Sequence, residues 1–407
     1  MMFGKKFAAL ILVLSLAIIF PSCGGKNAEF RKLMKEGEKY YGASEFEKAI
    51  ESFKKASELM PNDPNPYQNI AVCYSNLFLA TKSETEHKLA AELSENAIKY
   101  YKKVLELDPE RADAQMNISN EYAKVAAMFM DDGDLPNARK YLKKWLEFDP
   151  ANADAYYRMG VLDWGLCFAV KKPEVLLGTD EFIDKVAADE NAVKAVAKAG
   201  RLKKEDALSL INLIKTPEKD VLAAIDKKVF IEKLKRIKDI DDELAEKIYA
   251  CSTEDTFDIL KCIINAAPDL SFTKSKQARA IFTKNPDNMA IYVSKELGIK
   301  KTYASRAISE LMKHLKYEAI ADGLAMLDKS IEINPNAPDT YQYKTMLYVE
   351  KIKLEKDRKL LNEYAKKAEE NFIKASKLRT PDKSEEDLQK DVKQLRSQLK
   401  QLMAKRR

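Results

Sequence analysis

Glycine and histidine are scarce in this chain, and the motifs that usually carry enzyme chemistry are missing. The 407 residues include 12 glycines and 2 histidines, which leaves little material for phosphate-binding loops or histidine catalysis. No G-x-S-x-G, H-E-x-x-H, G-x-x-x-x-G-K-[ST] or G-x-G-x-x-G motif occurs. Neither His87 nor His314 lies near a cysteine or an aspartate in a recognisable catalytic arrangement. We therefore expect no enzymatic activity, no cofactor and no metal site.

A large excess of one charge is also missing. Lysine and arginine number 70 against 64 aspartates and glutamates, a formal net charge of +6. Proteins that bind nucleic acid usually have a larger surplus of basic residues to contact phosphates, so we do not expect a nucleic-acid partner. With 46% hydrophobic residues the chain can build a core, and its alanine, leucine, lysine and glutamate content favours helices.

Cysteines are few and widely spaced. Beyond Cys23 the chain has Cys73, Cys167, Cys251 and Cys262, with no C-x-x-C pair. This spacing is not that of a small disulfide scaffold or of a zinc site. We expect buried free thiols, although an exported chain could oxidise them and the sequence leaves their redox state open.

The N-terminus has the features of an export signal. Lys5 and Lys6 precede an uncharged apolar run, Phe7–Phe20, which is shorter than the ~20 residues that a membrane-spanning helix needs. This pattern is typical of a signal-peptide core. The segment Pro21-Ser22-Cys23 that follows resembles a bacterial lipobox, although Phe20 and Pro21 depart from its usual residues.

The lipobox resemblance implies that Cys23 becomes the lipidated first residue of the mature protein. Acyl chains such as palmitate contribute ~0.8 kcal/mol for each buried CH₂ group. Lipid on Cys23 would therefore hold the protein at a membrane without a spanning helix. Gly24 in place of aspartate implies the periplasmic face of the outer membrane more than the inner membrane. The alternative is an ordinary signal peptide that is cut nearby, with Cys23 incidental.

A repeat begins at Phe30. Six residues stand at fixed offsets from it: Gly37, Tyr40, Ala49, Phe53, Ala56 and Pro61. The segment resembles a tetratricopeptide repeat (TPR), a pair of helices in which small residues allow close approach and aromatic residues pack between the helices. The resemblance implies that Gly37 and Ala49 lie at the helix contact and that Phe53 is buried.

The pattern recurs along the chain. Further copies carry Ile70, Ala71, Tyr74, Ala97, Tyr101, Val104 and Pro109; then Ile118, Tyr122, Ala138, Leu142, Trp145 and Pro150; then Tyr156, Met159 and Gly160; and finally Tyr341, Tyr348, Ala368, Phe372 and Ala375. The copy that begins at Tyr156 lacks an immediate second helix. We expect Ile320–Pro335, with Gly323 and Leu327, to fold back onto Tyr156–Leu166 and complete it.

The region between these halves shows helix punctuation but no repeat register. Thr216-Pro217 and Asn285-Pro286 are helix starts, and Gly200 and Gly298 are helix stops. We expect a helical insertion and, if it is an appendage, residues 172–312 should be replaceable by a short linker. Within it, residues 288–311 resemble a bacterial helix-turn-helix, which would place Thr302, Ser305 and Arg306 where base-reading side chains lie.

These patterns predict an all-α fold, a TPR-type helical-hairpin solenoid interrupted by a helical insertion and ended by a capping helix. Ser384 and Asp387 open that last helix, on which Leu388, Val392, Leu395, Leu399 and Leu402 recur at helical spacing. The expected organisation is a signal peptide at 1–22, TPR array at 23–168, insertion at 169–315, continued array at 316–380 and C-terminal helix at 381–407.

The TPR resemblance implies a protein-binding groove lined by the first helix of each repeat. The outward positions there are Arg31, Met34, Glu38, Gln68, Val72, Met116, Asn120, Tyr157 and Trp164. The paired positions, Met34 with Glu38, Gln68 with Val72 and Met116 with Asn120, contain no lysine or arginine. The peptide-carboxylate recognition of the eukaryotic chaperone cofactors is therefore not expected. A partly apolar contact with a protein segment is expected, although Tyr157 and Trp164 could instead pack against the insertion.

The sequence therefore predicts a membrane-tethered scaffold that binds protein or peptide partners in the bacterial cell envelope, with a role in envelope assembly as one form of this. The competing hypothesis is a DNA-binding regulator that uses residues 288–311 and keeps its N-terminal segment as a short membrane anchor.

Overall fold

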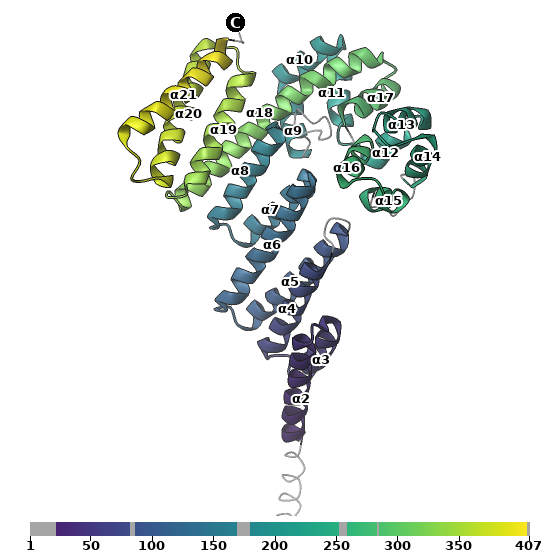
Figure 1. The fold of residues 1–407 in the computed structure, drawn as a ribbon, viewed down its shortest axis with the longest axis vertical. Coiled ribbons are helices and arrows are strands. Elements are labelled where there is room, and N and C mark those ends of the chain that lie inside the picture. Colours follow the sequence, from purple (N-terminus) through teal and green to yellow (C-terminus); the bar gives the residue numbers. More distant parts are fainter. Residues whose placement is uncertain (1–21, 82–85, 169–179, 252–258, 283–284, 405–407) are drawn as a thin grey trace, which may run out of the picture. The chain divides into compact units, whose positions relative to one another are not determined.

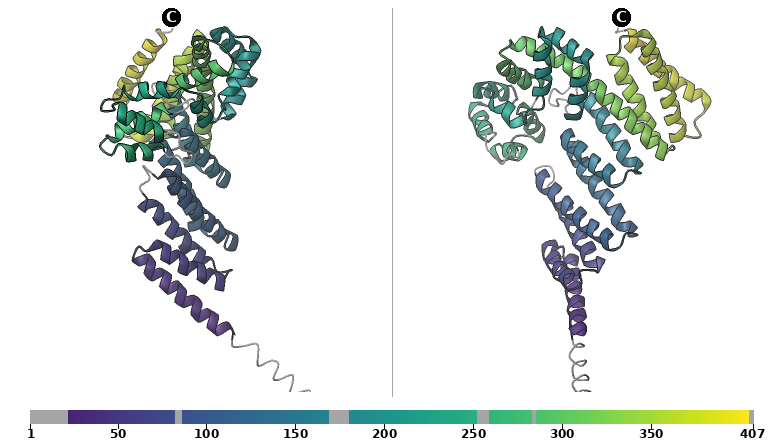
Figure 2. Two further views of the ribbon diagram at one scale, coloured as in Figure 1. Left: turned by 90° about the vertical axis from the view of Figure 1, so that its right-hand side faces the viewer. Right: turned by 180° about the vertical axis from the view of Figure 1, so that it is seen from behind.

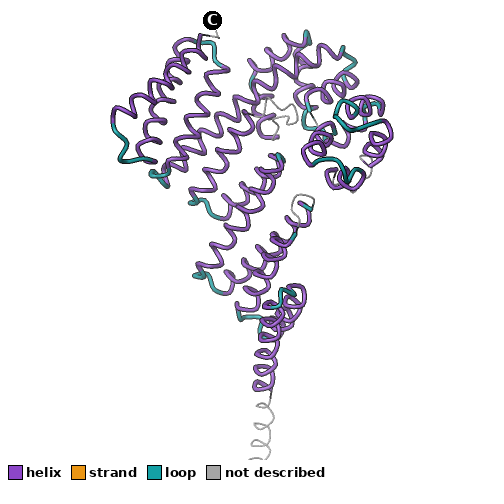
Figure 3. Tube along the Cα trace, in the orientation of Figure 1, coloured by secondary structure: helices purple, strands orange, loops and turns teal. Residues whose placement is uncertain are grey.

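The described part of the chain is helical and contains no strand (Figure 3). The computed structural model describes all residues except 1–21, 82–85, 169–179, 252–258, 283–284 and 405–407. In the described ranges, the repeats, the insertion and the C-terminal segment are all built from helices (Figure 1). The predicted all-α class is therefore confirmed.

The chain divides into two compact units, Met1–Met128 and Phe129–Arg407. Unit 1 consists of two helical hairpins and most of the helix that follows them. Its helices are α2 (Ser22–Gly42), α3 (Phe46–Leu59), α4 (Pro64–Ala80), α5 (His87–Leu107) and the greater part of α6 (Ala112–Asp132).

The first hairpin, α2 with α3, has the packing that the repeat pattern predicts. Phe53 is 1% exposed, and Ala49 and Ala56 are fully buried beside it. A Cβ atom on Gly37 would stand 2.5 Å from Phe53 Cε1, so the glycine gives the ring its space. These contacts confirm the register of the first repeat.

The second hairpin is longer than the first. The helix α5 has 21 residues, whereas α3 has 14. Asp63 caps α4 by accepting from the Asn65 backbone N–H at 2.9 Å. Ile70 and Ala71 of α4 are fully buried in the hairpin, as are Ala97 and Val104 of α5, so the predicted repeat register holds there too.

Unit 2 begins at the end of α6 and returns to the repeat pattern on both sides of the insertion. Its repeat helices are α7 (Leu135–Phe148), α8 (Ala153–Phe168), α18 (Lys301–Ile333), α19 (Pro338–Leu354) and α20 (Arg358–Arg379), and the C-terminal helix α21 (Glu385–Ala404) follows them.

The second half of α18 packs along α8, as Figures 1 and 2 show. A Cβ atom on Gly160 would stand 2.5 Å from Leu327 Cδ2 and 3.2 Å from the Gly323 carbonyl oxygen. Ser330 donates to the Ala153 carbonyl oxygen at 2.9 Å. The expected pairing of Ile320–Pro335 with Tyr156–Leu166 is therefore present.

The helix α18 does not break where the insertion was expected to end. It runs without interruption over 33 residues from Lys301 to Ile333, so residue 315 lies inside it. Its first half packs against the insertion helices and its second half against α8 and α19. One rigid element thus belongs to both the insertion and the repeats.

The insertion contains nine described helices and the start of α18, in two groups (Figure 1). The first group is α9 (Asp180–Ala188), α10 (Glu190–Gly200) and α11 (Lys204–Leu213), of which α9 and α10 pack on α18 and α11 packs on α9 and α10. The second is α12 (Glu218–Ala223), α13 (Lys227–Leu234), α14 (Asp242–Cys251), α15 (Ile259–Ala266), α16 (Phe272–Ile281) and α17 (Pro286–Glu296).

The second group has its own core, in which the rings of Phe230 and Phe282 stack at 5.0 Å. The segment after the predicted helix start Thr216-Pro217 is not one helix, because a turn at Ala224–Asp226 divides it into α12 and α13. Asp226 caps α13 by accepting from the Lys228 backbone N–H, and this local bond starts a new helix.

The expected helix boundaries hold at α17 and α21. Asn285 caps α17 by accepting from the Asn288 backbone N–H at 2.9 Å, and Ser384 accepts from the Asp387 N–H at 3.1 Å. The helix α21 covers α20 with Leu388, Val392 and Leu399, all buried.

No helix in the described ranges is long and apolar enough to cross a membrane. The segment Phe7–Phe20, predicted as a signal-peptide core, lies outside the described residues.

Candidate protein-binding face

Polar contacts join the first helices of three successive repeats in unit 1. Asn76 of α4 donates to the Tyr41 hydroxyl of α2 at 3.3 Å, and Gln68 of α4 donates to Asp113 of α6 at 3.1 Å. Helical spacing places these residues on one side of α4 and α6, while Ile70, Cys73 and other apolar residues form the buried side.

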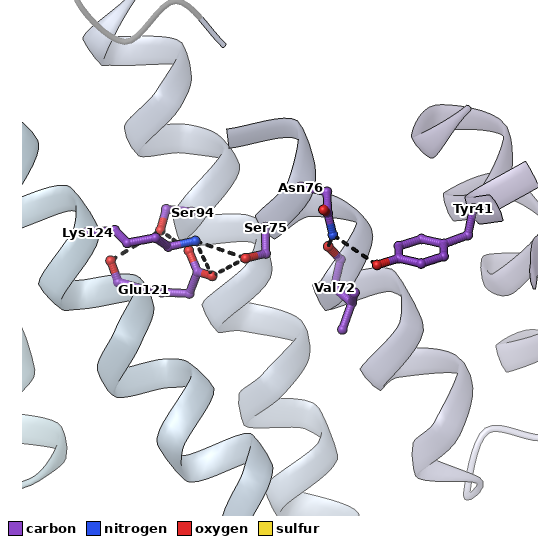
Figure 4. A network of polar contacts seen from close by, with 7 residues as sticks. All are labelled: Tyr41, Val72, Ser75, Asn76, Ser94, Glu121 and Lys124. Atoms are coloured by element: carbon purple, nitrogen blue, oxygen red, sulfur yellow. Dashed lines mark hydrogen bonds and ion pairs between the residues drawn. The ribbon is translucent and has the colours of Figure 1, made fainter. Parts of the chain in front are cut away.

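A buried carboxylate fixes the spacing of α4, α5 and α6 (Figure 4). Glu121 of α6 is 2% exposed, and it accepts from Ser75 at 2.6 Å and from Ser94 at 2.5 Å. Lys124 donates to the same carboxylate at 2.8 Å and to Ser75 at 2.9 Å. Every member is hydrogen-bonded, which favours a single arrangement of these helices.

Next to this network lies a face rich in side-chain amides, which we call the amide face. It comprises Gln68 and Asn69 on α4 and Met116, Asn117 and Asn120 on α6. Asn69, Asn117 and Asn120 have no hydrogen-bond partner within the described part of the chain, and Met116 is 59% exposed. The amide face therefore offers free donors and acceptors beside an exposed apolar side chain.

The helix α4 contains no charged residue over its 17 positions, although 33% of the chain is charged. The charged groups beside the amide face are in pairs: Asp113, which accepts from Gln68, pairs with Arg111 at 3.3 Å, and Lys124 is held by Glu121. The surface is therefore nearly neutral.

The seven predicted groove residues of unit 1 divide into three sets. Arg31 and Glu38 are exposed on α2, and Arg31 donates to the Asn27 carbonyl oxygen of its own helix at 3.3 Å. Met34 is half-buried and packs against the core of the first hairpin, so it offers little surface to a ligand. Gln68, Val72, Met116 and Asn120 share the side of α4 and α6 that carries the amide face.

Tyr157 and Trp164 pack in unit 2 against a residue that the sequence did not single out. The Tyr343 ring of α19 meets both edge-on, with centroid separations of 5.7 Å to Tyr157 and 5.3 Å to Trp164. Burial raises the pKa of Tyr157 to about 12, with nearby tyrosine and carboxylate groups contributing. These ring contacts hold α8 to α19.

Two of the predicted thiols are observed. Cys73 and Cys167 are free and buried, as expected, and burial raises the pKa of both. Cys23 lies in the first turn of α2, but its side chain and those of Cys251 and Cys262 lie outside the described residues. No group of metal-ligating side chains occurs in the described ranges.

The helix-turn-helix resemblance has a partial counterpart in the structure. The helix α17 ends at Leu297, Gly298 adopts a φ of 62°, and α18 begins at Lys301. Thr302, Ser305 and Arg306 are exposed. The second helix, however, is not a free recognition helix, because it continues for 33 residues into the repeats.

Sequence reasoning missed Asn69 and Asn117, which belong to the amide face, and Tyr343, which fixes the two aromatic residues. The signal that could have found Asn69 is the absence of charge along α4. No such signal marks Asn117, because α6 carries charged residues such as Asp113, Glu121 and Lys124.

No family model matches the sequence, and no curated protein matches it. Solved structures similar to the chain include the TPR2AB domain of yeast Sti1 in complex with pHSP90, at 17% identity over 92% of this chain and 99% of that one, with a TM-score of 0.20. The P58(IPK) TPR domain shares 13% identity over 92% and 98%, with a TM-score of 0.16.

The Naa15/Naa10 complex bound to HypK-THB shares 14% identity over 87% of this chain and 68% of that one, with a TM-score of 0.11. All three TM-scores are below 0.5, so these similarities are too weak to indicate a fold or a function for this chain. The assignment of a TPR-like, all-helical repeat fold rests on the hairpins described above, in which the small and aromatic positions of the pattern meet.

Proposed function

We propose that the chain is a lipid-anchored scaffold of the bacterial cell envelope and that it binds a protein partner on the amide face. The observation that carries the binding proposal is the set of unpartnered amides on α4 and α6, next to exposed Met116. Each amide side chain has both a donor and an acceptor, as does each peptide unit of an extended segment.

The partner that fits this surface is an extended and largely uncharged protein segment. Charged ligands would find few counter-charges on α4, which has none. Amides would bond the partner's backbone, and Met116 would contact an apolar side chain, since methionine adapts to irregular surfaces. The buried Glu121 network supports this role because it holds α4 and α6 at a fixed separation.

Membrane attachment through Cys23 is the second part of the proposal. It is supported by the sequence alone: the apolar run Phe7–Phe20 followed by Pro21-Ser22-Cys23. Lipidation would place unit 1 beside the membrane, and export would bring it to envelope partners. A role in envelope assembly is the function that agrees best with such a tethered binding surface.

Binding is tested by a photo-crosslinking residue placed at Asn120, compared with one placed at Lys54, an exposed residue of α3. We expect partner crosslinks from position 120 and none from position 54. Once the crosslinked segment is known, Asn117→Ala combined with Asn120→Ala should weaken its binding by at least about tenfold, since two hydrogen bonds are lost. Equal crosslinking from both positions would refute the amide face as the site.

The anchor is tested separately, by labelling with a fatty acid in the parent and in Cys23→Ser. The parent should incorporate the label and fractionate with membranes, and the variant should do neither. If both chains are labelled equally, Cys23 is not the lipidated residue, whatever the outcome of the crosslinking experiment.

A further inference from the structure

A carboxylate takes the place of a tyrosine in the fourth repeat. Tyr40, Tyr74, Tyr122 and Tyr348 fill the same repeat position in the other first helices, whereas α8 has Asp163 there. The Asp163 side chain is 0% exposed. Burying an ionised carboxylate costs free energy unless it is paired, so the neighbours of Asp163 decide its charge.

Arg139 of α7 joins Asp163 to a second carboxylate, Asp322 of α18. Its Nη1 donates to Asp163 Oδ1 and its Nη2 to Asp322 Oδ2. The Arg139 side chain is 4% exposed and that of Asp322 is 13% exposed. The buried Phe182 of α9 covers the guanidinium, with its ring centroid 4.7 Å from Arg139 Cζ. Four helices therefore meet at one guanidinium group.

The cluster has one cation for two anions. Asp163 Oδ2 and Arg139 Nε are buried and have no hydrogen-bond partner among the residues that the structure describes. If both carboxylates are ionised, a net charge of −1 is buried with one oxygen unpaired, which is unfavourable in a low-dielectric interior. A proton on the cluster removes that charge.

The charged groups around the cluster are at its rim or in pairs of their own. Lys143 of α7 binds Glu181 of α9 at 2.6 Å, and Lys185 lies beside Glu181. These three side chains are 42% to 47% exposed, so water screens them. On the other side, Lys316 of α18 pairs with Glu350 of α19 at 2.8 Å.

We propose that this cluster is a pH-sensitive latch: Asp163 carries one proton while α7, α8, α9 and α18 are held together, and loss of that proton loosens the junction. The proton exchanges with water, and no other bond is made or broken. Because α9 is the first described helix of the insertion, the latch joins the insertion to the third and fourth repeats.

The sign of the pH dependence follows from the environment of Asp163. Burial raises the pKa of Asp163 well above its usual range, Asp322 adds to the rise, and Arg139 opposes it. In the opened chain the pKa returns to its ordinary value. Between these two pKa values the closed junction binds more protons, so it is most stable at the acid end and loses stability as the pH rises.

The test is hydrogen exchange of α8, α9 and α18 in the full mature chain from about pH 5 to about pH 8, corrected for intrinsic exchange rates. One linked proton changes the ratio of closed to open junction by up to about tenfold for each pH unit within the interval. We expect that slope in the parent and in Asp154→Asn, a matched control on the exposed side of α8. Asp163→Asn, which cannot ionise, should show no slope.

A direct titration keeps the proposal testable if Asp163→Asn does not fold. The carboxyl carbon of Asp163, followed by NMR in the unmodified chain, should titrate well above the ordinary range of aspartate. Titration at an ordinary pH would overturn the latch. A folded Asp163→Asn chain that keeps the parent's slope would overturn it equally.

Discussion

Gly37 and Phe53 lie so close together that no side chain fits between them. A Cβ atom on Gly37 would stand 2.5 Å from Phe53 Cε1 and 2.7 Å from Cδ1, well inside the normal contact distance of two carbon atoms. The ring is 1% exposed and is enclosed by Ala49, Ile50 and Ile70. The first hairpin therefore depends on the absence of one methyl group.

Gly37→Ala should accordingly destabilise unit 1. We expect a loss of about 1–3 kcal/mol in the free energy of unfolding, the usual cost of overpacking a core, measured by urea denaturation of residues 23–407. Phe53→Ala should cost more, about 3–5 kcal/mol, because it leaves a cavity.

Gly165→Ala is the matched control for this prediction. Gly165 also lies within a helix, α8, but a Cβ atom there would have nothing within 4 Å. Alanine should be neutral or stabilise by about 0.5–1 kcal/mol, since glycine costs backbone entropy in a helix. If Gly37→Ala is as harmless as Gly165→Ala, the packing described for the first hairpin is wrong.

The repeat register could be predicted because it depends on local volume. Small residues such as Gly37 and Gly160 and large ones such as Phe53 recur at fixed offsets, and each offset corresponds to one contact between two helices. The pairing of α8 with the distant α18 was predictable for the same reason, since Gly323 and Leu327 fit the pattern of a second helix.

The features that could not be predicted depend on contacts between residues that are far apart in the sequence. Nothing near Asp163 in the chain indicates that Arg139 and Asp322 will surround it. The amides Asn69 and Asn117 resemble any polar surface residues until the structure shows that they lack partners. The continuity of α18 past residue 315 was missed because a repeat pattern marks where a helix packs, not where it begins.

Cys73 should react very slowly with thiol reagents in the folded chain. Burial raises the pKa of the Cys73 thiol to about 12, and only the thiolate reacts. At pH 8 its alkylation should be slower than in the urea-unfolded chain by on the order of a thousandfold, as three pKa units imply. Mass spectrometry of the peptide that contains Cys73 measures this rate, and alkylation at the unfolded rate would contradict the burial.

Removing one partner of the ion pair between Lys316 and Glu350 should destabilise the chain, whereas replacing both residues with apolar ones should destabilise it less. Its side chains are 10% and 5% exposed, and the two charged atoms are 2.8 Å apart. Lys316→Met alone should cost about 1.5–3 kcal/mol, because the buried carboxylate loses one charged partner and keeps Lys353, which binds Glu350 Oε1 at 2.5 Å. Combining it with Glu350→Leu should recover most of that loss, which a double-mutant cycle in urea would measure. Additive costs would show that the two residues do not interact.

The last prediction concerns how much of the insertion the repeats require. Replacement of residues 172–312 by a linker was expected to be harmless if the insertion were an appendage. From the structure we expect that deletion to destabilise the repeats, because it would remove the first part of α18 and the whole of α9. Phe182 of α9, fully buried, would no longer cover Arg139.

A smaller deletion should be tolerated. The helices α12 to α16 have a core of their own around Phe230 and Phe282. Replacing residues 216–284 with a flexible linker leaves α9 and α18 intact. We expect this chain to keep the parent's cooperative unfolding in unit 2, and the 172–312 deletion to lose at least about 3 kcal/mol, the cost of removing a buried phenylalanine.

Circular dichroism during urea unfolding compares the two deletions. If both behave like the parent, α9 does not support the third and fourth repeats, and the contact between Phe182 and Arg139 has no energetic role. If both fail, the contact of α16 with the end of α6 should be removed singly. There Arg279 lies 3.5 Å from Asp132, whose side chain is 6% exposed. Failure of the longer deletion alone would place the requirement on α9 and the first half of α18, where four helices meet at Arg139.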